Sequence, residues 1–200
     1  MHRVFISFHH DNDQWYKDEL VRWGKANDIF IDGSVEMGEI PEDWEPNKIR
    51  EYIRDEHLKD TTVTILLVGT ETKNRKHIDW ELFSSMYDGK KNKKSGLLII
   101  NLPSTKCTYH TLCSAEEKES VLPGVKNWIT IDDRAEFERR YPYMPARIID
   151  NLLNKQADIS VINWDDLKDP DILRLLLDKA FESRTTNKYD MSRPMRMRNS

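Results

Sequence analysis

The sequence has few cysteines, no glycine-rich phosphate loop and no long apolar run, and each absence excludes a class of protein. Cys107 and Cys113 are the only two cysteines among 200 residues, and we expect them to be reduced thiols. No Gly-x-Gly-x-x-Gly pattern occurs, which argues against an ordinary dinucleotide-binding dehydrogenase. The longest apolar runs have only the length of a strand, so no membrane span or membrane partner is expected.

An excess of basic residues is also absent. The net charge is −4, and Lys and Arg are spread along the chain, so no nucleic-acid partner is expected. The start, MHRVFISF, lacks the features of a secretory signal, which predicts a cytoplasmic location. What is present, 38% apolar and 33% charged residues, is typical of one soluble globular domain.

Two short motifs raise the question of a metal. Cys107, His110 and Cys113 form Cys-x2-His-x2-Cys, which supplies three zinc ligands but lacks a clear fourth. The run from His9 to Asp13 also contains ligand types, but Asp after a strand more often caps the following helix. We therefore predict no metal and no cofactor, with a metal as the open alternative at both places.

Strand and helix patterns alternate along the chain. Apolar and β-branched runs predict strands at 4–8, 29–31, 62–68, 97–100 and 128–131. Helical spacing and N-terminal signals predict five helices. One lies around 13–27, and one is capped by Asn74 and ends at Gly89. The other three begin at Pro46, Pro145 and Pro170. The irregular stretch between the last two strands, which holds both cysteines, is a candidate insertion.

This alternation predicts an α/β fold, an open and mainly parallel sheet with helices on both faces and 62–68 at its centre. In such sheets ligands bind beyond the carboxyl ends of the strands, where the strand order switches direction. The rule selects three loops, 8–13, 32–36 and 69–73. In the third, Gly69 and Thr70 offer backbone N–H groups for a phosphate.

Two segments resemble one known family. The opening RVFISFHHDND and the stretch KDTTVTILLVGTETKNRKHIDWEL are similar to the TIR-like domains of the Thoeris antiphage defence system, which share a flavodoxin-like architecture. The resemblance covers roughly residues 1–132. Chain length predicts a single domain over 1–182, and helical signals predict a C-terminal helical part over 133–182. Composition predicts a basic flexible tail at 183–200, because Arg and Lys outnumber Asp there.

The resemblance implies an enzyme that cleaves NAD+, as substrate and not cofactor, at the nicotinamide glycosidic bond. The product, often a cyclic ADP-ribose, would activate an effector protein, with a phage component as trigger and self-association as a further partnership. Glu81 corresponds to the catalytic glutamate. Where relatives often carry a tryptophan before it, this chain has His77. The expected substrate-binding residues are Phe8, His9, Asp11, Asp32, Gly69, Thr70, His77 and Trp80.

The chemistry fits one glutamate. Nicotinamide leaves NAD+ as a neutral molecule, so the reaction needs support for positive charge on the ribose, which a carboxylate supplies. The helical wheel places Glu81 outside the apolar stripe of its helix, and Asp79 points to a different face. Without the resemblance, Glu81 would be taken for a solvated helix carboxylate.

Two other functions stay open. A non-catalytic TIR-like module that acts through assembly would use Glu81 as a surface residue. A flavodoxin-like response or nucleotide-binding domain is the other, but the first strand is followed by His9 and His10, and not by the paired acidic residues of a phosphoacceptor site.

Overall fold

The computed structural model of the chain describes residues 1–34, 40–41, 43–90 and 92–199. Within these residues, five parallel strands form one sheet in the order β2-β1-β3-β4-β5. The strands are β1 (His2–Ser7), β2 (Phe30–Asp32), β3 (Val63–Val68), β4 (Gly96–Asn101) and β5 (Ser160–Asn163). The α/β class, the parallel sheet and the central place of the third strand are thereby confirmed.

Helices connect the strands. They are α1 (His10–Ala26), α2 (Pro46–Tyr52), α3 (Lys76–Met86), α4 (Ala115–Val121), α5 (Arg134–Arg140), α6 (Ala146–Asn154) and α7 (Pro170–Ser183). A π-helical turn, Ile53–His57, continues α2, and Thr72–Asn74, Pro103–Thr105 and Trp164–Asp166 form short 3-10 turns. Of the helices in the described ranges, none combines the length and the apolar character that a membrane crossing requires.

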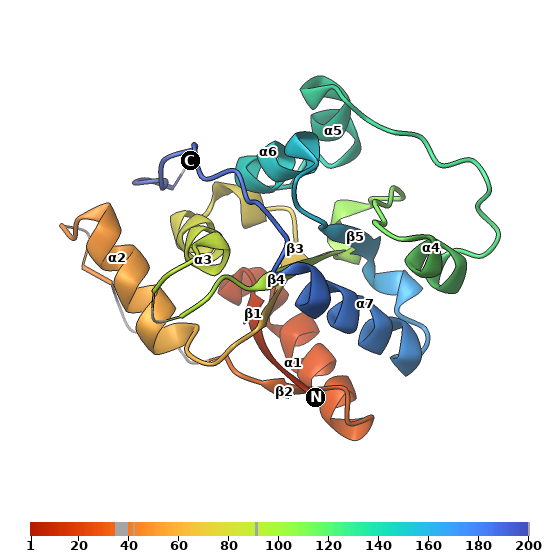
Figure 1. Cartoon of the computed structure of the whole chain (residues 1–200), viewed down its shortest axis with the longest axis horizontal. Coiled ribbons are helices and arrows are strands. Elements are labelled where there is room, and N and C mark those ends of the chain that lie inside the picture. Colours follow the sequence, from red (N-terminus) through yellow and green to blue (C-terminus); the bar gives the residue numbers. More distant parts are fainter. Residues whose placement is uncertain (35–39, 42, 91, 200) are drawn as a thin grey trace.

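The sheet lies between two layers of helices (Figure 1). All six residues of β3 are buried, because alternate side chains face opposite layers. Ile65 and Leu67 pack with residues of α1 and α7, whereas Leu66 and Val68 pack with residues of α3, α5 and α6. The continuous apolar run at 62–68 is therefore explained by helices on both faces.

Several predicted element boundaries are wrong. The run 128–131 is irregular, and the fifth strand is instead β5, which pairs with β4. Arg75 and not Asn74 is the N-cap of α3. The helix ends at Met86 because Tyr87 is extended, and Gly89 does not take the left-handed conformation. The stretch between β4 and β5 also contains two unpredicted helices, α4 and α5.

The segment after α7, expected from its composition to be a flexible tail, packs against α3 and α6 (Figure 1). Asn187 is buried, and its Oδ1 accepts a hydrogen bond from the backbone N–H of Asp158 at 2.9 Å. Met195 is buried, and the indole of Trp80 donates to the carbonyl of Arg196 at 2.6 Å. Amino-acid composition could not predict these contacts, because single polar side chains and backbone atoms hold the segment in place.

Candidate active site

The site is built where β1 and β3 lie next to each other in the sheet. Strand order reverses there, since β2 lies on one side of β1 and β3, β4 and β5 follow on the other. This reversal is the topological switch point at which open α/β sheets bind ligands. Ser7, the last residue of β1, is in register with Leu66 of β3.

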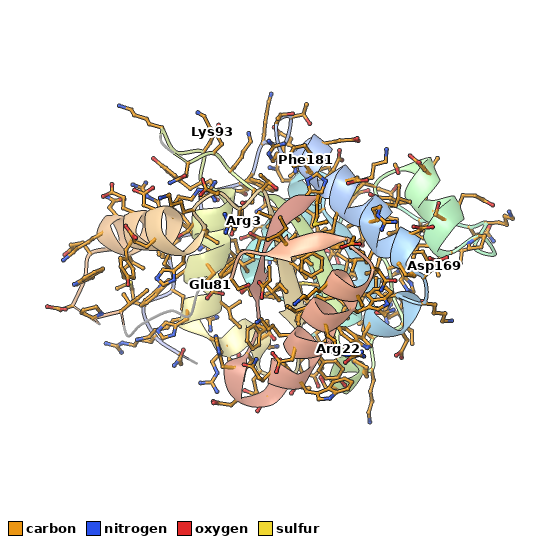
Figure 2. All side chains as sticks on the ribbon, turned by 90° about the horizontal axis from the view of Figure 1, so that it is seen from below. Arg3, Arg22, Glu81, Lys93, Asp169 and Phe181 are labelled. Carbon is orange, nitrogen blue, oxygen red and sulfur yellow. The ribbon has the colours of Figure 1, made fainter. Side chains whose placement is uncertain are left out.

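α3 brings a carboxyl group to this point. The turn between β3 and α3 is closed by Thr72, whose Oγ1 accepts from the backbone N–H of Gly69 at 2.8 Å. Ile78, Leu82 and Met86 then pack the helix onto the sheet. Glu81 lies on α3 close to the strands (Figure 2), and only 5% of its surface is exposed. The wheel-based expectation of a solvated carboxylate does not hold for this residue.

Glu81 is joined to the sheet by one short hydrogen bond. The hydroxyl of Ser7 donates to Glu81 Oε2 at 2.5 Å, and both side chains are buried. Burial raises the pKa of Glu81 to about 8, because desolvation penalises the carboxylate more than the hydrogen bond from Ser7 favours it. At neutral pH this carboxyl therefore holds a proton unless a positive charge is placed beside it.

Other buried polar atoms near the ends of β1 and β3 lack hydrogen-bond partners. His9 caps α1, with Nδ1 accepting from the N–H of Asn12 at 3.3 Å, but its Nε2 has no partner. The same holds for Asp13 Oδ2, and burial raises the pKa of this carboxyl. On α3, the hydroxyl of Ser84 is a third such group. Buried polar groups are nearly always satisfied, so His9 Nε2 and Asp13 Oδ2 are candidate contacts for a ligand or a water molecule.

Comparison with known proteins identifies the family of the chain. The sequence model of the family described as Thoeris protein ThsB, TIR-like domain, matches residues 5–107, slightly more than half of the chain. The chain belongs to this family. The matched range includes both Ser7 and Glu81, and membership of a Thoeris family indicates a role in antiphage defence. No curated protein matches the chain.

The TIR-like domain brings some of the predicted site residues to this point and not others. Asp13, which the sequence suggested as a helix cap with a metal ligand as the open alternative, adjoins Gly69: a Cβ on Gly69 would meet Asp13 Oδ2 at 2.4 Å. The first turn of α1 therefore adjoins the loop after β3. The amide of Gly69 is not free for a phosphate, however, because Thr72 accepts its hydrogen bond. Thr70, the next residue, is half-buried.

The predicted aromatic residues lie in other environments. Phe8 is buried in the core on the α1 face, with its ring centroid 4.3 Å from that of His10. Trp80 is buried on the other side of the sheet with residues of α2, such as Ile49. His77 is exposed, with its ring 5.0 Å from that of Trp80. Trp80 therefore supports the core beneath α3.

The acidic candidates are near the same sheet edge. Asp32, at the end of β2, has one carboxylate oxygen 3.3 Å from Lys17 Nζ and the other accepting from the N–H of Ser34. Asp11 is exposed in the first turn of α1. Residues 35 and 36 of the predicted loop lie outside the described residues.

Sequence reasoning missed Ser7 as the partner of Glu81. The signal available was a hydroxyl residue at the last position of the first strand. Asp79 does face away from Glu81, as expected. Both of its carboxylate oxygens accept from the guanidinium of Arg147, at 2.8 and 3.0 Å.

The three residues of the Cys-x2-His-x2-Cys motif each contact a different partner. The thiol of Cys107 donates to the carbonyl of Arg140, whereas Cys113 accepts from the hydroxyl of Ser160 at 3.6 Å. His110 pairs with Asp166 at 2.6 Å. Across the described parts of the chain, no group of three or more His, Cys, Asp or Glu residues is arranged to hold a metal ion.

Proposed function

We propose that this domain cleaves NAD+ at the bond between nicotinamide and ribose, with Glu81 as the catalytic carboxylate. The observation that carries the proposal is the placement of Glu81. A glutamate buried at the switch point of the sheet, held by Ser7 at 2.5 Å, lies within the range matched by the Thoeris TIR-like family. A buried carboxyl with a strongly raised pKa is typical of functional sites.

The reaction needs little besides this carboxylate. The bond between ribose C1′ and nicotinamide N1 breaks, and its electron pair goes to the nitrogen, so nicotinamide leaves as a neutral molecule. Positive charge develops on the ribose, and the Glu81 carboxylate stabilises it. Water, or an adenine nitrogen of the same molecule, then bonds to C1′. A proton passes to solvent, and the product is ADP-ribose or a cyclic form of it.

The raised pKa of Glu81 has a role in this scheme. In the empty site the carboxyl is protonated at neutral pH, since its pKa is about 8. The substrate carries a positive charge on the nicotinamide ring, and a nearby opposite charge lowers the pKa of a carboxyl. Substrate binding therefore converts Glu81 to the anionic form that stabilises the transition state.

The wider role follows from the family. The ADP-ribose product acts as a diffusible signal for a partner effector protein, and a component of the infecting phage serves as the trigger in the cytoplasm. Self-association of the domain is part of this proposal, because TIR-like domains commonly act in assemblies.

A non-catalytic assembly module is the second candidate function. Glu81 is not the surface residue expected for such a module, but its near-complete burial favours this function in another way, because it leaves little of the carboxyl accessible to a substrate. In this case Glu81 and Ser7 would only join α3 to β1. Retained affinity for NAD+ without turnover would identify such a module.

The deciding experiment uses phage-infected cells that express the wild type, Glu81→Gln or Glu119→Gln. Gln keeps the size of the buried group, and Glu119 is an exposed glutamate on α4 that serves as the matched control. Nicotinamide and ADP-ribose species are separated by chromatography of the lysates. We expect products from the wild type and Glu119→Gln but not from Glu81→Gln. Equal lysates from all three soluble proteins and the empty control would reject catalysis.

A further inference from the structure

A cavity lies outside the range matched by the family. Its volume is about 470 Å³, within the range usual for small-molecule sites. Buried apolar side chains of Leu112, Phe137 and Leu152 line it. Another wall comes from the connection between α4 and α5, residues 122–131, here called the arm. Figure 1 shows the arm as a long loop that runs away from the sheet.

The charged side chains that line the cavity are all basic. Lys118, Arg140 and Lys155 line the cavity, and no carboxylate does, although the chain as a whole carries a net charge of −4. Asp132 pairs with Lys155, and Glu136 accepts from Arg140 at 2.6 Å, but neither acid is part of the lining. Two of the three cations are thus paired with acids outside the lining, and Lys118 is the lining cation for which the described residues show no ion pair. The lining itself still offers cationic donors and no carboxylate from the described residues.

Aromatic rings stand next to two of these cations. The guanidinium of Arg140 lies 4.8 Å from the ring centroid of Tyr109, and Lys118 Nζ lies 5.1 Å from that of Trp128. Hydroxyl and amide groups of Thr111, Thr130 and Asn127 complete the polar lining. A flat aromatic surface with adjacent cations is the combination that binds a nucleobase together with a phosphate.

The arm leaves its own hydrogen-bonding groups available. Among the described residues, the backbone of 126–132 makes no hydrogen bond to other backbone groups. Val125 and Ile129 expose 43% and 64% of their surface, although both are large and apolar. An extended segment of this kind has free amides and carbonyls with which to close over a bound molecule.

We propose that this cavity is a second ligand site, which binds a phosphorylated nucleoside. The base lies against Trp128 and Tyr109, and the phosphate is held by Lys118 and Arg140. The site is separate from Glu81, and the proposal does not depend on NAD+ cleavage.

The test is calorimetric titration of the purified full chain with AMP, adenosine and inorganic phosphate. AMP contains no nicotinamide bond, so turnover at Glu81 does not enter the measurement. We expect AMP to bind at least tenfold more tightly than either adenosine or phosphate, because only AMP uses both the rings and the cations.

Variants locate the binding. Arg140→Gln and Trp128→Ala should each weaken AMP binding by roughly tenfold or more. Lys126→Gln is the matched control, because Lys126 is on the same arm but does not line the cavity. It should bind AMP as the wild type does, and so should Glu81→Gln. Thermal melts show whether each variant is folded, and Lys118→Gln, which removes the other proposed phosphate ligand and should weaken AMP binding in the same way, replaces Arg140→Gln if the latter is not.

Three results would overturn the proposal. One is the absence of AMP binding to the wild type at millimolar concentration. Another is phosphate binding as tightly as AMP, which would leave the rings without a role. The third is AMP binding that is lost in Glu81→Gln but unchanged in the folded cavity variants, which would place the nucleotide at the other site.

Discussion

The hydroxyl of Ser7 and the carboxyl of Glu81 meet at 2.5 Å across the boundary between β1 and α3, 74 positions apart in the chain. Both groups are buried. The contact holds the glutamate at the carboxyl edge of two adjacent strands, and it is the main interaction that opposes the effect of burial on its pKa. The protonation state of Glu81 therefore affects both the stability of the folded protein at a given pH and the proposed reaction.

The first prediction concerns stability and pH. Glu81 has an ordinary pKa of 4.5 in the unfolded chain and a pKa of about 8 in the folded protein. Between these values the folded protein holds a proton that the unfolded chain has lost, so the free energy of unfolding falls as pH rises. This contribution is fully present below about pH 4.5 and is lost by about pH 8, with a slope on the order of 1.4 kcal/mol per pH unit at most.

Urea denaturation of the wild type and Glu81→Gln from pH 5 to pH 8 measures this effect. Gln cannot ionise, so the difference between the two proteins isolates residue 81 while other titrating groups cancel. We expect the wild type to lose stability relative to Glu81→Gln as pH rises. Stability curves that run parallel across this range would show that Glu81 is not held protonated.

The second prediction concerns Ser7→Ala. Removing the hydroxyl takes away the hydrogen bond that lowers the pKa of Glu81, so this pKa should rise further. A hydrogen bond to a charged group contributes about 1.5–3 kcal/mol, which corresponds to roughly one to two pH units. Because the anionic form of Glu81 is the active one, the acidic limb of nicotinamide release from NAD+ should move to higher pH by this amount. Ser120→Ala, at an exposed serine, should leave the profile unchanged. A lower rate with an unshifted profile would mean that Ser7 only supports packing.

The fold could be predicted where local pattern and tertiary packing agree. The run at 62–68 is apolar on both faces, and only a central strand buries both faces. Local pattern and tertiary packing disagree for the segment 128–131 and for β5. Trp128 to Ile131 has the composition of a strand but no neighbouring strand, whereas the four residues of β5 pair with β4 and, through Val161, with Thr111. Here a segment forms a strand only if it reaches the edge of the sheet, and the local sequence does not indicate which segment does so.

The site was predictable only in part for a similar reason. The resemblance to the family identified Glu81, but helical periodicity indicated a solvated side chain. The structure buries it because β1 ends directly beside α3, a relation set by sheet order and helix orientation. The partner Ser7 and the unpartnered His9 Nε2 depend on the same long-range arrangement. Spacing along the chain cannot reveal such contacts.

The third prediction concerns the buried ion pair behind the site. Arg147 is 1% exposed, and its guanidinium donates to both oxygens of Asp79 and to the carbonyls of Arg193 and Pro194. Arg147→Ala leaves Asp79 Oδ1 and the two carbonyls without this donor, although Asp79 Oδ2 still accepts from the backbone N–H of Arg196, and it should cost about 3–5 kcal/mol of unfolding free energy. Denaturant titration measures it.

The pair itself is tested by a double-mutant cycle with Asp79→Asn. The cost of the double variant should be smaller than the sum of the two single costs, because the residues share one interaction. Arg22→Ala, which breaks the exposed pair with Glu19, is the control and should have no measurable effect. Additive costs for Arg147 and Asp79 would contradict the role given to the pair.

The fourth prediction concerns the contact between β4 and α7. A Cβ on Gly96, the first residue of β4, would lie 1.8 Å from the carbonyl oxygen of Ala180 and 2.4 Å from its carbonyl carbon. Both are backbone atoms of a packed helix, so Gly96→Ala must displace α7 from the sheet and should cost roughly 1–3 kcal/mol or more. Gly124→Ala is the matched control, because a Cβ there meets nothing within 4 Å. Its stability should match or slightly exceed that of the wild type. Denaturant titration of both variants decides the matter, since equal midpoints would mean that α7 does not lie this close to β4.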